Sequence, residues 1–222
     1  MRIPTWYPQD SIAAPTFSIS IDLIPPSIIE TLNAGGVVAY PTSTQPGLAS
    51  LPTQQGLDAL FALKQRPENM PVSLGVASIE QAKQFVEFPE LAEKLLSAFP
   101  QGSITVILPA LQKFDQRIGG ENIAIRILAH PLARKLTKSV GAITATSANQ
   151  SGELPEKDSK SAGLRLGLPE QAILSGMCGG EVPSTIIQFI RDESQSNEFS
   201  VTIMREGVIP RQDVMLWLTK VN

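Results

Sequence analysis

GGVVAYPTSTQPGLASLPTQQGLDALFALKQR, residues 35–66, is the stretch that decides the fold of this chain. The apolar run at residues 37–40 predicts a short buried strand, which Pro41 ends because proline has no backbone N–H to donate to a sheet. Apolar side chains then recur at helical spacing, which predicts a helix from about residue 55 to residue 63. A strand, a turn and a helix in succession indicate an α/β fold.

Both ends of this unit carry polar side chains that suit an anionic ligand. Thr42, Ser43 and Thr44 follow the strand, at the position where ligands bind in open α/β sheets. Lys64 and Arg66 stand together at the end of the helix, so hydroxyls and cations could together cradle a phosphate-bearing ligand. The alternative is that the two cations are solvated and only complement the dipole of the helix C-terminus.

The composition excludes several classes of protein. With 222 residues, 42% of them hydrophobic, the chain can form one large domain or two small ones with a substantial core. A formal net charge of −3 argues against binding nucleic acid through overall charge, although a local basic groove is compatible with it. The single cysteine, Cys178, rules out an intrachain disulfide and a thiolate metal cluster.

The single histidine, His130, leaves little material for a His-rich metal site or for Ser–His–Asp catalysis. It precedes Pro131 at the expected start of a helix, where a capping or packing role is the better interpretation. The chain shows no apolar signal run and no stretch that approaches a membrane span. We therefore expect a soluble, cytoplasmic protein with no membrane partner.

Helices and strands alternate along the rest of the chain. Further helices are expected at residues 25–33, opened by a capping box of Ser27 and Glu30, and at residues 78–86, 89–99 and 131–140. Further strands are expected at residues 72–76, 104–108, 123–126, 143–146, 172–174, 185–189 and 201–204. Residues 112–122 are expected to form an exposed loop, and residues 192–197 a polar turn. We predict an N-terminal extension, residues 1–20, and one α/β domain, residues 21–222, with helices packed on a mixed β-sheet.

A hydroxyl, an amide or a cation stands at the end of several predicted strands. The residues in this position are Thr42, Ser43, Thr44, Arg126, Ser147, Asn149, Ser184, Thr185 and Arg205. If these strand ends meet, they form a site for an anion such as a nucleotide, although no P-loop or Gly-x-Gly-x-x-Gly motif is present. The same set suits hydrolysis poorly, because no histidine or pair of carboxylates accompanies it. For each residue alone, capping of a turn or a helix is the alternative.

Five segments, in this order, resemble the YrdC family of L-threonylcarbamoyladenylate synthases. They are GGVVAYPT (35–42), LKQRP (63–67), IAIR (123–126), SANQSG (147–152), and PSTI (183–186) together with REG (205–207). GSIT (102–105) also resembles the Gly-Pro-Leu-Thr with which a strand of the family begins. Each segment is short, but their combined order and spacing make the resemblance specific, and it spans about residues 27–209.

This resemblance implies a single α/β domain around a twisted mixed β-sheet with a concave, cationic ligand surface. It implies an enzyme, a nucleotidyltransferase that joins L-threonine, bicarbonate and ATP into threonylcarbamoyl-AMP and pyrophosphate, with Mg²⁺ carried by the phosphates. The product serves the t6A modification of position 37 in tRNA, so tRNA or the complex that transfers the group is an implied partner. No covalent nucleophile or metal-ligating residue is implied, and catalysis would come from positioning and charge neutralisation.

The resemblance also assigns residues to the two larger substrates. The residues implied in binding ATP are Lys64, Arg66, Asn122, Ser147, Asn149 and Arg205. The residues implied in binding threonine or its carbamate are Thr42, Arg126 and Ser184.

Three residues depart from the family pattern at this site. Ser43 replaces an acid, Pro46 replaces an aromatic residue that would help to wall the pocket, and Gly75 stands where many members carry a threonine-contacting histidine. The extra C-terminal domain of the longer members is expected to be absent. Two alternatives therefore stay open: an RNA-binding module on the same fold, and a YciO-like nucleotide-binding protein without threonine specificity.

Overall fold

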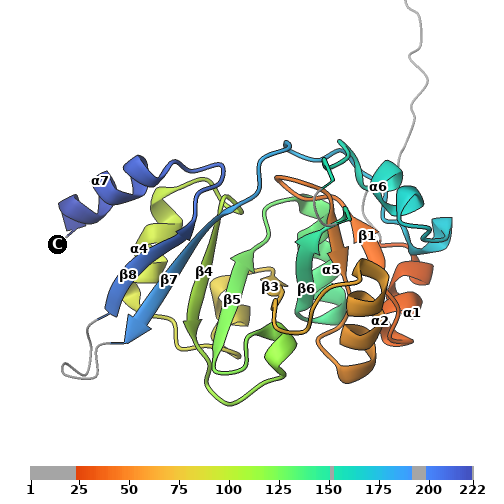
Figure 1. Ribbon diagram of the computed structural model, residues 1–222, viewed down its shortest axis with the longest axis horizontal. Coiled ribbons are helices and arrows are strands. Elements are labelled where there is room, and N and C mark those ends of the chain that lie inside the picture. Colours follow the sequence, from red (N-terminus) through yellow and green to blue (C-terminus); the bar gives the residue numbers. More distant parts are fainter. Residues whose placement is uncertain (1–23, 151–152, 192–198, 222) are drawn as a thin grey trace, which may run out of the picture.

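An open, eight-stranded β-sheet forms the centre of the structure (Figure 1). The computed structural model describes residues 24–150, 153–191 and 199–221. The predicted extension at residues 1–20 and the predicted turn at residues 192–197 lie outside these ranges, as do the last two residues of the segment 147–152.

The sheet is mixed, as predicted. Its strands are β1 (Val38–Tyr40), β2 (Gly47–Ala49), β3 (Ser73–Val76), β4 (Ile104–Pro109), β5 (Asn122–Ile127), β6 (Ile143–Ser147), β7 (Thr185–Arg191) and β8 (Phe199–Arg205). They lie in the order β1-β2-β6-β3-β5-β4-β7-β8. The pairs β3–β5 and β4–β7 are parallel, and the other neighbouring pairs are antiparallel. Strands distant in the sequence, such as β2 and β6, therefore end side by side.

Helices pack against the sheet and leave part of one face uncovered (Figure 1). The described residues contain the α-helices α1 (Pro26–Asn33), α2 (Gln54–Lys64), α3 (Ile79–Ala82), α4 (Glu90–Ala98), α5 (Pro131–Val140), α6 (Ser159–Arg165) and α7 (Arg211–Val221), and the 3₁₀ helices η1 (Gln116–Ile118) and η2 (Glu170–Ala172). His130 caps α5 as predicted, because its Nδ1 accepts a hydrogen bond of 3.3 Å from the Leu132 N–H. None of the helices among the described residues is long and apolar enough to cross a membrane.

Alternating side chains divide the core between the two faces of the sheet. On one face, Leu95 of α4 packs in the same apolar cluster as Ile104 of β4 and Ile125 of β5. Since successive strand residues point to opposite faces, Thr105 and Arg126 face away from α4. In Figure 1, α4 and α5 lie behind the sheet, and no helix lies in front of β4, β5 and β7. This uncovered face is where the site described below opens.

One predicted cap and one predicted helix end are wrong, because of proline and of a local turn. Ser27 does not begin a capping box: Pro25 is the N-cap of α1 without a side-chain bond, and Pro26, which has no N–H, occupies the first helical turn. The helix predicted at residues 78–86 starts at the Ser78 cap but ends at Ala82, because residues 83–85 form a turn and Val86 makes a single bridge to Ala110.

Other differences arise from tertiary contacts. Residues 172–174 do not form a strand, because only Ile173 makes a single bridge, to Ala39 of β1. The segment at residues 112–122 is not simply an exposed loop, since it holds η1, where Arg117 is only 8% exposed and pairs with Asp58 and Asp115. The sequence patterns also missed β2, α6 and α7.

Candidate functional site

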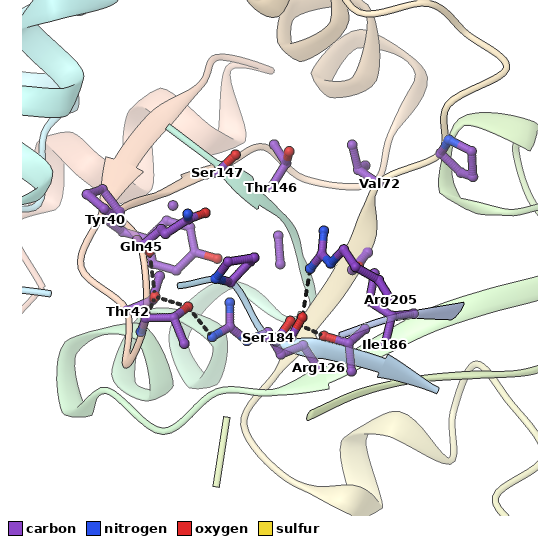
Figure 2. Close-up of a pocket in the computed structure, with 18 of the residues that line it drawn as sticks. Tyr40, Thr42, Gln45, Val72, Arg126, Thr146, Ser147, Ser184, Ile186 and Arg205 are labelled. Carbon is purple, nitrogen blue, oxygen red and sulfur yellow. Dashed lines mark hydrogen bonds between the residues drawn. The ribbon is translucent and has the colours of Figure 1, made fainter. Parts of the chain in front are cut away.

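A polar cavity of about 180 Å³ opens on the uncovered face of the sheet. Its walls come from the loop between β1 and β2, the segment after α2, and residues of β3 to β8 that meet there. Three arginines, Arg66, Arg126 and Arg205, line it, and no carboxylate does so among the described residues. Figure 2 shows Arg126 and Arg205 approaching the cavity from β5 and β8, with Ser184 between them. The arrangement concentrates positive charge for an anionic ligand.

Arg126 is held rigidly near the end of β5. Its Nε and Nη2 donate to the Gly102 carbonyl at 3.1 and 2.8 Å, and Nη2 also donates to the Thr44 hydroxyl at 2.7 Å. Burial lowers the pKa of this guanidinium, but arginine stays charged in proteins. Its Nη1 has no hydrogen bond to a described residue, so one face of the group can receive a ligand.

Thr42 shapes the loop between β1 and β2. Its hydroxyl accepts the Thr44 N–H at 3.0 Å and donates to the Gln45 carbonyl at 2.6 Å, and the residue is only 2% exposed. This local hydrogen bonding is the turn-forming behaviour that threonine shows after strands. Because Thr44 in turn accepts from Arg126, the loop and the guanidinium form one connected network.

Ser184 joins two strands at the other side of the cavity. Its hydroxyl lies 2.8 Å from the hydroxyl of Thr105 in β4, the parallel neighbour of β7. Arg205 Nη2 donates to the Ser184 carbonyl at 2.8 Å, as the dashed line in Figure 2 marks. Thr185, by contrast, is fully buried and donates to the Ile209 carbonyl, so it supports the structure rather than the cavity.

Lys64 is not a solvated cation at a helix end. The side chain is only 7% exposed as a residue, and Nζ donates to the backbone carbonyls of Ser147 and, at 2.8 Å, of Asn149. Burial, and then the charge of Arg66, lowers the pKa of Lys64 to about 8. Arg66 itself lines the cavity and donates to the Met70 carbonyl at 2.6 Å. The pair therefore braces two loops beside the cavity.

The structure brings six of the nine predicted site residues to this cavity. They are Thr42, Arg66, Arg126, Ser147, Ser184 and Arg205. Lys64 lies behind Ser147, and the Asn149 amide donates to the Glu153 carbonyl at 2.8 Å, so neither lines the cavity. Asn122 begins β5, four residues and about 13 Å from Arg126 along the strand, and does not line it either.

The three residues that depart from the family pattern, Ser43, Pro46 and Gly75, each contact a defined neighbour. Pro46 lines the cavity, and its carbonyl accepts from the Ala148 N–H at 2.8 Å. The Ser43 hydroxyl lies against Gly102, where an added Cβ would approach it to 2.4 Å. A Cβ on Gly75 would lie 3.1 Å from Leu128, so this leucine fills the space beside residue 75.

Sequence reasoning missed the segment that covers the loop after β1. Gly179 and Gly180 donate backbone N–H groups to the carbonyls of Thr42 and Thr44 at 3.1 and 3.2 Å. An added Cβ on Gly179 would come within 2.1 Å of the Ser43 carbonyl, so only glycine allows this approach. The paired glycines were a signal of such close contact. The sequence also predicts no role for Thr105, whose hydroxyl positions Ser184.

Comparisons with known proteins agree with this architecture. The Sua5/YciO/YrdC family model, described as telomere recombination, matches residues 30–207. A threonylcarbamoyl-AMP synthase of Photobacterium profundum is 32% identical over 81% of this chain and 97% of its own length. A protein of the same name from Stenotrophomonas maltophilia is 35% identical over 73% of this chain and 91% of its own.

Solved structures give the same result. P. abyssi Sua5, crystallised with L-threonine, superposes with a TM-score of 0.72 at 28% identity over 84% of this chain. The chain spans 55% of the length of that Sua5 protein. E. coli YciO, at 23% identity and a TM-score of 0.66, shares the fold. On the family model, the relatives and this architecture, the chain belongs to the Sua5/YciO/YrdC family.

Proposed function

We propose that this chain is a threonylcarbamoyl-AMP synthase, an enzyme that uses L-threonine, bicarbonate and ATP. The observation that carries the proposal is a cavity with three arginines, several hydroxyls and no carboxylate among the described residues. Bicarbonate, the phosphates of ATP and the carboxylate of threonine are all anionic. Fixed guanidinium groups bind carboxylates and phosphates through paired hydrogen bonds. The curated relatives with this name cover most of the chain.

The size of the cavity suggests how the substrates divide it. At about 180 Å³ it is smaller than the roughly 300–1,000 Å³ of pockets that enclose a drug-sized ligand. Threonine and its carbamate would occupy the enclosed part, beside Thr42, Arg126 and Ser184. The nucleotide would extend along the rim, with Arg66 and Arg205 on its phosphates and Ser147 beside it. Lys64 and Asn149 would contribute through the loops that they hold. Asn122 would contribute at the outer end of the nucleotide.

The proposed chemistry needs no protein nucleophile. The threonine amine attacks the carbon of bicarbonate, and water leaves to give the carbamate. A carbamate oxygen then attacks the α-phosphorus of ATP, and pyrophosphate leaves. Arginines that neutralise the carbamate and the phosphates let the anions approach each other, and a pre-organised site lowers the barrier further. Mg²⁺ would be carried by the phosphates of ATP.

Threonine-dependent release of pyrophosphate is the test. Purified full-length chain, ATP, Mg²⁺ and bicarbonate should release pyrophosphate when L-threonine is added, and mass spectrometry should detect threonylcarbamoyl-AMP. L-Valine, which replaces the hydroxyl with a methyl group, is the matched control and should support much less turnover. Equal pyrophosphate release with and without threonine would refute the proposal. We place the activity in the cytoplasm, where the product would be passed on for tRNA modification.

A second candidate is a nucleotide-binding protein without threonine specificity. The surroundings of Pro46, Ser43 and Gly75 favour it, because Leu128 fills the space beside residue 75 and no aromatic side chain stands at position 46. Calorimetry separates the two: this candidate binds ATP with an affinity that saturating L-threonine does not change, whereas the synthase binds both ligands.

A further inference from the structure

A second cavity, of about 400 Å³, lies on the opposite face of β4 and β5 from the site. Ile104 and Ile127 line it, whereas their neighbours Thr105 and Arg126 line the first cavity. Since successive strand residues point to opposite faces, one layer of the sheet separates the two cavities. The remaining walls come from α3, the C-terminal half of α4 with the loop after it, and α5.

Arg134 of α5 is the one cation that lines this second cavity in the described chain. Its Nε is buried and has no hydrogen-bond partner among the described residues, and its side chain makes no ion pair with them. Buried polar groups in native proteins are nearly always hydrogen-bonded, and leaving one unpaired costs free energy. The unpaired Nε is therefore a donor that no described residue uses, and a ligand with an acceptor would satisfy it.

The other groups in the cavity define the ligand further. Leu96, Phe99, Ile104 and Ile127 provide an apolar wall next to the guanidinium. Glu80 also lines the cavity and keeps its negative charge, because a hydrogen bond from Ser78 holds its pKa below the usual range. It lies exposed, however, where solvent screens that charge. The partly buried positive charge of Arg134 beside this apolar wall matches an anion with one charge and an apolar body.

We propose that this cavity is a binding site for a small carboxylate with an apolar tail. The carboxylate pairs with the Arg134 guanidinium and satisfies Nε, and the tail packs on Leu96 and Phe99. The site is separate from the proposed synthase function and does not depend on it.

The same cavity is placed to influence the first one. Gly102 lines it, and the Gly102 carbonyl is the acceptor for two hydrogen bonds from Arg126. Gln101 also lines it and donates to the Leu128 carbonyl at 3.2 Å. A ligand that packs against residues 101–102 therefore shifts the group that orients Arg126, so its binding is coupled to the arginine site.

A titration followed by NMR tests both statements on the full-length chain. The probe is 4-methylpentanoate, and its neutral counterpart 4-methylpentan-1-ol is the matched ligand control. We expect saturable shifts at the backbone amides of Gln101 and Gly102 and at the Arg134 side chain, with the alcohol at least about tenfold weaker. Arg134→Gln should weaken the carboxylate by a similar factor. Lys138→Gln, which removes an exposed charge from the same helix, should not.

Several outcomes would overturn the proposal. These are the absence of saturable shifts, equal affinity for acid and alcohol, or unchanged affinity in Arg134→Gln. If Arg134→Gln does not fold, Arg134→Lys replaces it, since it keeps the charge but loses the planar fork and should bind more weakly than the wild type. The Arg126 Nε–H resonance should move as Gln101 saturates, and a constant resonance would refute the coupling.

Discussion

Lys64 gives a sharp test of the structure, because a buried ammonium group should make stability depend on pH. Its pKa falls from 10.5 in an exposed lysine to about 8, chiefly through burial and then through Arg66. Between about pH 8 and about pH 10 the folded chain has lost this proton while the unfolded chain keeps it. The unfolded state then binds more protons, so the free energy of unfolding should rise with pH in this window.

The window closes at its upper end because of Tyr40. Burial raises the pKa of this tyrosine to about 12, so above about pH 10 the unfolded chain loses a proton that the folded chain keeps. Stability should therefore fall again there. Across two pH units the Lys64 contribution is at most about 2.7 kcal/mol.

Urea unfolding from about pH 7.5 to about pH 10 measures this effect. Lys64→Met should be less stable at every pH, because it loses the donors to Ser147 and Asn149, but its stability should no longer rise across the window. The control is Lys94→Met, which removes an exposed lysine paired with Glu90 and should keep the wild-type slope. If the wild type and Lys64→Met show the same dependence on pH, the ammonium group is not buried as described.

Three further predictions concern the cavity. Arg66→Ala should weaken ATP binding by about 1.5–3 kcal/mol, the usual value of a charge-assisted hydrogen bond, and unchanged affinity by calorimetry would move the phosphates elsewhere. Pro46→Tyr should lower the KM for threonine several-fold, a change of about 1 kcal/mol, and leave the KM for ATP nearly constant. A change in the KM for ATP instead would place this loop beside the nucleotide. Gly102→Ala should lower the melting temperature and the threonine affinity more than Gly167→Ala. The two glycines have nearly the same φ, +79° and +77°, so the backbone strain is matched. Only at residue 102 would the added Cβ meet another group, the Ser43 hydroxyl at 2.4 Å. Equal effects of the two substitutions on melting temperature would show that the contact at residue 102 is not tight.

Local patterns predicted the elements whose cause is local. Proline, paired glycines and helical spacing were enough for β1, for α2 and for the His130 cap of α5, since turn chemistry and periodicity depend on near neighbours. The strand-end pattern predicted six residues that line the cavity: Thr42, Thr44, Arg126, Ser147, Ser184 and Arg205. The combined motifs predicted the family, which the comparisons confirm.

Only the tertiary structure decided which strand ends meet and which cations are buried. β2 has three residues and no pattern of its own, and it exists because β1 and β6 pair with it on both sides. Residues 172–174 are as apolar as a strand, but Ala172 ends the 3₁₀ helix η2 and only Ile173 makes a bridge, to Ala39. Lys64 stands at the end of α2, where a cation is usually solvated. It is buried because carbonyls 83 and 85 residues away in the sequence come to its ammonium group. Strand order and such distant contacts depend on the packing of the whole chain, which no short window of sequence contains.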